Sequence, residues 1–216
     1  MNNKRVVAFV PIKLNSQRLP KKNILQLNGK PLCWHILNTL TKVESIDQVY
    51  VYCSDELIKN YIPNKVKFLK RDSRLDGDLI KGYDIYESFI NEVESDIYVL
   101  AHTTSPFIKS TTINSALKKV LQGENDSAFS ALKTQTFAWY RNKPINYDLN
   151  DVPRTQDLEP VFIETSAFFI FEKDIFTTHR RRIGFSPYIQ EVNNIEAVDI
   201  DTKEDYELAL KLAQSN

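Results

Sequence analysis

Four cationic side chains lie within ten residues near the start of the chain. Lys13, Arg18, Lys21 and Lys22 follow the apolar segment 6–12 in a loop whose course is restricted by two prolines. A triphosphate needs several positively charged donors at once, because each of its oxygens accepts more than one hydrogen bond. The loop is therefore a candidate phosphate-binding loop, with a solvated basic loop as the equal alternative.

Two carboxylates, Asp199 and Asp201, are separated by one residue near the other end of the chain. If the apolar segment 195–198 is a strand, the alternation of side chains places both carboxylates on one face. Mg²⁺ prefers such hard oxygen ligands and is usually held by one or two carboxylates together with substrate phosphates. The pair is thus a candidate magnesium site. The alternative is that Asp201 or Thr202 caps the helix predicted at 203–213.

The common glycine-based nucleotide motifs are absent from the sequence. Its five glycines form no G-x-G-x-x-G pattern, and the spacing from Gly77 to Gly82 is not followed by the Lys and Ser or Thr of a P-loop. Cys33 and Cys53 lie far apart, which argues against a disulfide framework and a Cys-based zinc site, so we expect two buried thiols. Any nucleotide must be bound in another way.

Composition limits the classes of partner. The 216 residues carry 28 Lys and Arg against 28 Asp and Glu, and 42% are hydrophobic, which suits a single α/β domain over 1–216. Zero net charge argues against nucleic-acid and membrane partners. Because no apolar run approaches the roughly 20 residues of a bilayer span and no export signal is visible, we expect a cytoplasmic protein.

Short β-branched segments alternate with helix-like segments along the chain. The predicted strands are 6–12, 48–53, 66–69, 96–101, 127–132, 167–171 and 195–198, and the predicted helices are 31–40, 84–93, 111–121 and 203–213. This alternation predicts a mostly parallel central sheet flanked by helices. Ligands bind beyond the carboxyl ends of such strands, so the loops after Ile12, Cys53, Leu69 and Ala101 form the predicted site.

Segment 134–159 interrupts the alternation. It is rich in aromatic and turn-forming residues and shows no helical pattern, so we predict an inserted hairpin. Its aromatic side chains would pack either against the body of the domain or against a second copy of the chain. They are Phe137, Trp139, Tyr140 and Tyr147.

Five motifs taken together resemble the acylneuraminate cytidylyltransferases, the enzymes that make CMP-activated acidic sugars. The motifs are Pro11-Ile12-x-x-x-Ser16-x-Arg18-Leu19-Pro20-x-Lys22-Asn23, Gly29-Lys30-Pro31-Leu32, Arg71-x-x-x-Leu75-x-x-Asp78, Thr104-Ser105-Pro106 and Asp199-Ile200-Asp201-Thr202-x-Glu204-Asp205. Each alone is weakly specific, but their order and spacing span nearly the whole chain. The resemblance implies a Rossmann-like nucleotidyltransferase fold and a homodimer formed through an inserted arm. It also implies transfer of CMP from CTP to an acidic sugar with release of pyrophosphate.

The resemblance also implies roles for the nucleotide side of the site. Arg18, Lys22 and Asp201 would be catalytic, the two cations acting on the CTP phosphates. Asp199 and Asp201 would hold Mg²⁺. The remaining nucleotide-binding residues would be Lys13, where the family usually has Arg, together with Asn23, Arg71 and Ser105.

The acceptor side departs from the family. His102 and Thr104 follow the strand 96–101, where relatives contact the acceptor. Sialic-acid-activating relatives carry an Arg for the sugar carboxylate at about the place of Ile163, and an apolar residue cannot pair with a carboxylate. We therefore expect an acceptor that differs from N-acetylneuraminate. The other candidate acceptor contacts are the cation Arg154 and the polar residues Gln156 and Glu164.

Two other functions stay open. Asp-x-Asp also marks metal-dependent nucleotide-sugar glycosyltransferases of related architecture. In those enzymes the motif normally follows a strand in mid-chain, but in this sequence that position holds residues 101–105, which contain no aspartate. An inactive relative is disfavoured, because the phosphate and metal positions carry chemically competent residues. Release of pyrophosphate from CTP, Mg²⁺ and an acidic sugar separates the three.

Overall fold

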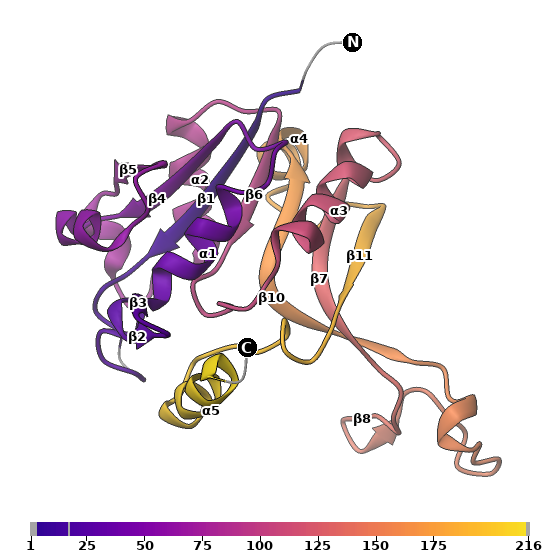
Figure 1. The fold of residues 1–216 in the computed structure, drawn as a ribbon. Coiled ribbons are helices and arrows are strands. Elements are labelled where there is room, and N and C mark those ends of the chain that lie inside the picture. The colour runs from indigo at the N-terminus through magenta and orange to yellow at the C-terminus, as the bar shows by residue number, and fades with distance from the viewer. Residues whose placement is uncertain (1–3, 17, 215–216) are drawn as a thin grey trace.

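A seven-stranded sheet forms the centre of the computed structural model, which describes residues 4–16 and 18–214. The strand order is β11-β7-β10-β6-β1-β4-β5, and only β10 runs antiparallel to its neighbours (Figure 1). The strands are β1 (Val6–Ile12), β4 (Gln48–Cys53), β5 (Val66–Lys70), β6 (Ile97–Ala101), β7 (Ser127–Thr134), β10 (Val161–Glu172) and β11 (Pro187–Val192). The predicted mostly parallel sheet is confirmed.

Helices cover both faces of the sheet. On one face lie α1 (Leu32–Leu40) and α3 (Ser110–Leu121), and on the other lie α2 (Gly82–Glu92) and α4 (Lys173–His179). Helix α5 (Lys203–Gln214) packs beside the small hairpin of β2 (Gln26–Leu27) and β3 (Lys30–Pro31). Short 3-10 turns complete the fold: η1 (Lys22–Ile24), η2 (Glu56–Tyr61), η3 (Ser73–Asp76) and η4 (Thr155–Asp157). No helix of the described residues is long and apolar enough to cross a membrane.

Strand β1 shows why continuous apolar runs become central strands. Successive side chains point to opposite faces, so Ala8 and Val10 pack under α1 and α3, while Val7 and Phe9 pack under α2. The Phe9 ring stacks on Phe89 of α2 with 4.2 Å between ring centroids. Both faces of β1 are dry, and its carboxyl end therefore delivers the following loop to the edge of the sheet at a fixed position.

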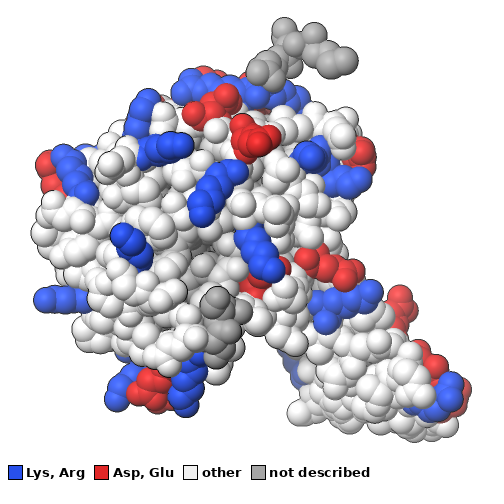
Figure 2. All heavy atoms as spheres, viewed as in Figure 1, with Lys and Arg blue, Asp and Glu red and all other residues white. Residues whose placement is uncertain are grey.

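The segment between β7 and β10 forms an arm. The two strands continue beyond the sheet, pairing from Val161 with Thr134 to Glu164 with Ala131, and a hairpin of β8 (Trp139–Tyr140) and β9 (Lys143–Pro144) follows (Figure 1). Figure 2 shows the arm as a lobe beside the body, with a broad uncharged surface and charged residues at its tip. Segment 134–159 thus contains a short hairpin, and its role as an inserted arm stays a prediction.

One predicted strand is wrong. Residues 195–198 form a turn, because the side-chain oxygen of Asn193 accepts hydrogen bonds from the N–H groups of Ile195 and Glu196. The true edge strand is β11, which sequence analysis missed because its polar residues Gln190 and Glu191 interrupt the apolar run. Helix α4 was also missed, because its seven residues are too few for a clear periodic pattern.

Candidate functional site

Three adjoining hollows open at the carboxyl edge of the parallel strands, and Lys13 lines all of them. One, of about 390 Å³, is lined by Ser16, Arg18 and Lys22. A second, of about 310 Å³, lies against residues that include Arg71. The third, of about 450 Å³, lies between the loops that follow β1, β4 and β5. All three hollows lie at the ends of strands where the site was predicted, and ligand binding there stays a prediction.

The cations after β1 converge on a carboxylate from the far end of the chain. Lys22 Nζ lies 2.8 Å from Asp201 Oδ1, and an Arg18 guanidinium nitrogen lies 2.9 Å from Asp201 Oδ2. The Lys22 side chain is only 13% exposed, whereas Arg18 is 70% exposed. Lys22 therefore has a defined position inside the hollow, and Arg18 reaches it from the rim.

The contacts of the neighbouring residue Ile200 hold Asp201 at this place. The Ile200 N–H donates to the Thr104 carbonyl over 2.9 Å, and the Ile200 side chain is buried against Leu19, Leu27 and Leu32. Hydrophobic burial of this one side chain, worth roughly 2 kcal/mol, holds the tail on the loop after β6. The two flanking aspartates are thereby fixed beside the cations.

The start of α5 leaves Asp201 available for this role. The Thr202 and Asp201 N–H groups donate to Asp205 over 2.8 and 3.0 Å, and the Asp205 N–H donates to the Thr202 hydroxyl over 3.2 Å. This is a capping box with the acid at its third position. Of the two predicted caps, Thr202 is the one that the helix uses.

Asp199 lies in an acidic environment. Partial burial raises the pKa of its carboxyl, and the nearby charges of Asp201 and Asp205 raise it further, while a hydrogen bond with Thr104 and the charge of Lys22 act in the opposite direction. The negative charge of Asp201 raises the pKa of Asp199, because two adjacent carboxylates repel each other. A divalent cation between them would remove this repulsion. Within residues 4–16 and 18–214 no group of three or more metal-ligating side chains occurs. Mg²⁺ takes most of its ligands from water and phosphates, so two carboxylates are chemically compatible with it, and a magnesium site at Asp199 and Asp201 stays a prediction.

Arg71 and Ser105 present buried polar atoms without partners. Arg71 is 2% exposed, and its guanidinium donates to the Tyr52 carbonyl over 3.3 Å and pairs with Asp76. Its Nε and the hydroxyl of Ser105 have no hydrogen-bond partner among the described residues. Buried polar groups are normally satisfied, and Arg71 lines the hollow of about 310 Å³, so its unpartnered Nε is suited to a polar ligand. A nucleotide contact for both residues stays a prediction.

Asn23 connects two of the loops that surround the site. Its side-chain amide donates to the Lys13 carbonyl over 2.7 Å, and its oxygen accepts a hydrogen bond from the Thr103 hydroxyl. The side chain is buried and satisfied by protein, so the structure assigns it a part in holding the loop after β1 against the loop after β6. A direct contact with nucleotide stays a prediction.

His102 lies beside the hollow that Arg71 lines. Its Nδ1 lies 2.6 Å from the carbonyl of Ser166, which can only accept, so the proton is on Nδ1 and Nε2 is left as an acceptor. Burial lowers the pKa of the imidazole, and the charges of Arg182 and Lys22 lower it further. The ring is therefore neutral near pH 7, with Nε2 at 3.5 Å from the Tyr86 hydroxyl.

A bulge in β10 produces this arrangement. The register with β7 shifts between Glu164 and Phe169, and Ser166 has a positive φ of 57°. The shift turns the Ser166 carbonyl away from the ladder and toward His102. In the same region Glu164 accepts a hydrogen bond from Arg182 over 2.8 Å, and its predicted contact with the acceptor stays a prediction. Sequence reasoning missed Arg182, whose only visible sign is the run of three arginines at 180–182.

Two predicted acceptor residues lie elsewhere in this chain. Arg154 and Gln156 belong to the arm, where Arg154 pairs with Asp157 over 2.6 Å and is 74% exposed. The arm carries them away from the sheet edge that holds His102 and Glu164. An acceptor contact made by Arg154 or Gln156 within one chain is thus not supported by their position.

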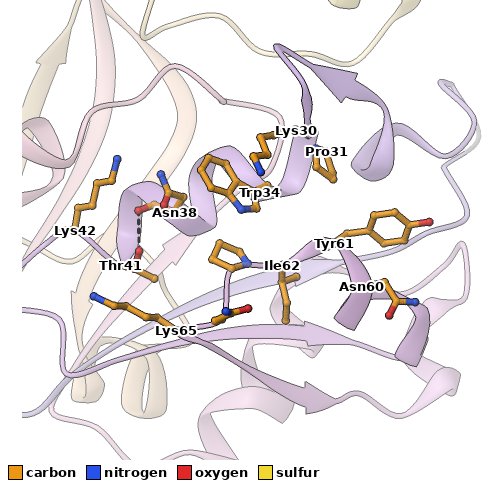
Figure 3. A pocket seen from close by; sticks show the side chains of 12 residues that line it. Lys30, Pro31, Trp34, Asn38, Thr41, Lys42, Asn60, Tyr61, Ile62 and Lys65 are labelled. Atoms are coloured by element: carbon orange, nitrogen blue, oxygen red, sulfur yellow. Dashed lines mark hydrogen bonds between the residues drawn. The ribbon is translucent and has the colours of Figure 1, made fainter.

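Another hollow, of about 580 Å³, contains none of the predicted site residues. It runs along α1 to the segment before β5 and is lined by Trp34, Asn38 and Tyr61, with Lys30, Lys42 and Lys65 at its rim (Figure 3). Neither carboxylates nor the cations after β1 face it. The chemistry of the chain is concentrated instead at the smaller hollows around Lys13.

Comparison with known proteins agrees with this geometry. A family model described as "Cytidylyltransferase" matches residues 7–216. The chain belongs to the cytidylyltransferase family. Its motif residues from the loop after β1 to the aspartates before α5 fall within the matched range.

Individual family members are distant. An N-acylneuraminate cytidylyltransferase of Streptococcus agalactiae serotype V is 24% identical over 211 residues, covering 93% of this chain and 51% of the relative. A pseudaminic acid cytidylyltransferase of Campylobacter jejuni is 25% identical over 232 residues, covering 97% of both chains. The chain thus spans about half the length of the streptococcal relatives that it matches.

A solved structure titled as a CMP:2-keto-3-deoxy-manno-octonic acid synthetase complexed with CTP shares the fold. Its TM-score is 0.71 at 17% identity, with 98% of this chain and 100% of the other covered. The cytidylyltransferase fold is therefore shown from β1 to α5.

Proposed function

We propose that this protein transfers CMP from CTP to a hydroxyl group of a sugar acid. The observation that carries the proposal is the meeting of Lys22 and Arg18 with Asp201 in the hollow after β1, within a chain of the cytidylyltransferase family. The acceptor oxygen forms a bond to the α-phosphorus of CTP and loses its proton to solvent. The bond between that phosphorus and the bridging oxygen breaks, and pyrophosphate leaves with the electron pair.

The cations of the loop stabilise the leaving group. Lys22, Arg18 and Lys13 all line the same hollow, where they neutralise the charge that develops on pyrophosphate. Asp201 pairs with both Lys22 and Arg18. Binding of CTP replaces the carboxylate by phosphate oxygens, so Lys22 and Arg18 exchange one anionic partner for another.

Once phosphate oxygens replace Asp201 as the partner of Lys22 and Arg18, the Asp201 carboxylate is available to a metal ion together with Asp199. Asp199 and Asp201 would hold Mg²⁺, which supplies positive charge to the phosphates when bound. The chain's own part is to keep the two carboxylates adjacent, which it does through the buried side chain of Ile200 and the cap at Thr202. Neither aspartate needs to move a proton.

The relatives suggest the class of acceptor. Their names include N-acylneuraminate and pseudaminic acid, both acidic sugars. Ile163, which is 53% exposed at the start of β10, offers no charge to a carboxylate. We therefore infer a sugar acid that differs from N-acetylneuraminate.

Pyrophosphate release tests the proposal. The protein is mixed with CTP and Mg²⁺ and with N-acetylneuraminic, pseudaminic, diacetyllegionaminic or 3-deoxy-manno-octulosonic acid in turn, and CMP-sugar is identified by mass spectrometry. We expect turnover with one of the acids other than N-acetylneuraminic acid. Efficient turnover of N-acetylneuraminate would contradict the acceptor inference. Cleavage of a nucleotide-sugar, with no pyrophosphate from CTP and any acid, would favour the glycosyltransferase alternative.

We also propose that the arm binds a second copy of this chain. Many of the exposed large apolar side chains of the described residues lie on it: Phe137, Trp139, Tyr140, Ile145, Leu149, Val152, Phe162 and Ile163. Such a patch indicates a protein interface, and two identical arms form a closed interface by twofold symmetry. Sedimentation velocity is expected to give a dimer, and Trp139→Lys a monomer. A wild-type monomer at micromolar concentration would refute the proposal.

A further inference from the structure

One motif of the sequence takes no part in the proposed reaction. Gly29-Lys30-Pro31-Leu32 runs from the turn of the β2–β3 hairpin into α1, and its Lys30 and Pro31 line the hollow of about 580 Å³ along that helix. The opposite wall is the segment 60–65, which leads into β5. The volume of this hollow is within the roughly 300–1,000 Å³ of pockets that hold small ligands.

Contacts with the core hold both walls of the hollow. The buried Cys33 thiol of α1 donates to the Tyr61 carbonyl over 3.7 Å, which ties the segment to the helix. The Val66 N–H donates to the Pro63 carbonyl over 3.0 Å, so a turn precedes β5. Tyr61 and Ile62 pack on the same hydrophobic cluster as α1. The positions of both walls are therefore fixed by the fold.

The charged residues of the hollow are all cations. Its 12 lining residues include Lys30, Lys42 and Lys65 but no Asp or Glu. Within residues 4–16 and 18–214 none of these three lysines forms an ion pair, whereas Lys13 and Lys22 of the loop after β1 each pair with an aspartate. Because the whole chain has no net charge, this local excess of positive charge favours an anionic ligand.

The three lysines are spread along the hollow. Lys30 precedes α1 and Lys42 follows it, and the nine residues of this helix span about 13 Å. Figure 3 shows Lys42 and Lys65 at one end and Lys30 beside Trp34, nearer the start of α1. A compact anion would reach the lysines at one end only. An elongated ligand with several acidic groups can contact all three.

The uncharged polar groups of the hollow suit a sugar. The lining includes the side-chain amides of Asn38, Asn60 and Asn64 and the hydroxyl of Tyr61. Amides and hydroxyls both donate and accept hydrogen bonds, as the hydroxyl groups of a sugar ring do. Stacking of a nucleotide base needs an open aromatic face, but Lys30 Nζ lies over the Trp34 ring, 5.2 Å from its centroid. The lining therefore favours an acidic saccharide over a nucleotide.

We propose that the hollow along α1 binds an acidic oligosaccharide. Its carboxylates pair with Lys30, Lys42 and Lys65, and one of its sugar rings packs against Trp34. This hollow shares no lining residue with the three hollows around Lys13, so the site is separate from that of the proposed reaction. The inference does not rest on the transfer of CMP, and it gives the protein a non-catalytic binding site for chains of acidic sugars.

The two tryptophans of the sequence allow a direct test. They are Trp34 and Trp139, and Trp139 belongs to β8 of the arm. In the variant Trp139→Phe the fluorescence of tryptophan therefore reports on Trp34 alone. We expect trigalacturonic acid, a trimer with three carboxylates, to change this fluorescence saturably and to leave that of Trp34→Phe unchanged. No saturable change in Trp139→Phe, or an equal change in Trp34→Phe, would overturn the proposal.

Other probes, titrated in the same way, separate the chemistry of the ligand. The trimethyl ester of the trimer keeps its rings and hydroxyls but carries no charge, and it should bind about 10-fold more weakly or less. Inorganic pyrophosphate tests charge alone, CMP tests base stacking, and both should bind more weakly than the trimer. Equal binding of the ester would exclude the lysines from recognition. Tighter binding of pyrophosphate or CMP would show an anion site or a nucleotide site instead, and either result would overturn the proposal.

Charge variants in the Trp139→Phe background locate the trimer. Lys65→Gln should lower its affinity about threefold and Lys42→Gln combined with Lys65→Gln about 10-fold, because these lysines are exposed and each pair is screened. Two controls should bind as the parent does: Lys118→Gln removes an exposed charge from α3, and Lys22→Met removes one from the hollow of about 390 Å³. Unchanged affinity in the double variant, or an equal loss in either control, would overturn the proposal.

Discussion

Replacement of Lys22 by Met is the sharpest test of the phosphate site. Met keeps most of the length and the apolar stem of the side chain but removes the ammonium group that lies 2.8 Å from Asp201. The Lys22 side chain is 13% exposed, so its charge acts on the phosphates with little screening by water, unlike that of Arg18 at 70% exposure. Losing one such donor to the developing charge of pyrophosphate costs about 3–4 kcal/mol, which lowers kcat/KM roughly 10²–10³-fold.

The fold is expected to survive this change. Asp201 keeps Arg18 at 2.9 Å and is itself 30% exposed, so no uncompensated buried charge is created. The free energy of unfolding should fall by only about 1 kcal/mol, the upper end for accessible ion pairs. For a chain of this size that is a loss of about 2–4 °C in Tm.

The assay is continuous release of pyrophosphate at saturating Mg²⁺, with CTP and acceptor varied, together with thermal unfolding of each variant. Lys42→Met is the matched control, because it removes an equal charge from the hollow along α1 instead (Figure 3). We expect Lys42→Met to behave as wild type. Retention of kcat/KM within about threefold in Lys22→Met would refute the assignment of the phosphate site, and a Tm loss above about 10 °C would show that Lys22 acts through stability.

Four further changes test other parts of the structure. Asp201→Ala should abolish Mg²⁺-dependent turnover while circular dichroism stays unchanged, and Asp199→Ala should be damaging to a smaller extent; near-normal turnover of Asp201→Ala would exclude it as a metal ligand. Partial burial acts to raise the pKa of Asp126, but hydrogen bonds from the Phe185 and Ser186 N–H groups and the Ser127 hydroxyl outweigh it and lower the pKa below its ordinary 3.8. Its ionised form therefore stabilises the fold above pH 3.8, and Asp126→Asn should lose about 1 kcal/mol at pH 7 and approach wild type as the pH falls below 3.8 in urea titrations. Gly184→Ala places a Cβ into the Asp126 carboxylate, so we expect the free energy of unfolding to fall by about 1–3 kcal/mol, measured by urea titration. An unchanged Tm would show that the loop moves to accept the Cβ without cost.

Much of the site was predictable because its residues follow strands that the sequence marks clearly. Buried apolar runs such as 6–12 end at fixed places, so Lys13, Arg18 and Lys22 had to lie at the sheet edge. Asp201 was predicted to follow a strand at 195–198, and these residues form a turn instead. Asp201 nevertheless lies beside the cations, because the buried side chain of Ile200 holds the segment there. The position depends on hydrophobic burial, which the motif did not reveal.

The acceptor side was less predictable, because it depends on an irregularity. No residue pattern indicates that β10 shifts register between Glu164 and Phe169, and this shift is what brings the Ser166 carbonyl to His102. Arg182 reaches the same place from a loop in which neighbouring arginines face other partners, Arg180 pairing with Asp84. Side chains that are brought together by a bulge and a loop show neither the helical nor the strand spacing in the sequence, so sequence patterns do not predict their contact.

The ion pair between Lys22 and Asp201 joins residues 179 positions apart. During synthesis the phosphate-binding loop and all strands of the sheet therefore leave the ribosome before the aspartates do, and domains begin to fold from the N-terminal side. Ile200 can seat only on a surface that Leu19, Leu27 and Leu32 have already formed. The carboxylate that pairs with Lys22 and Arg18 is thus synthesised only after all strands of the sheet, and a product cleaved before Ile200 would keep the residues of every sheet strand but lack Asp201.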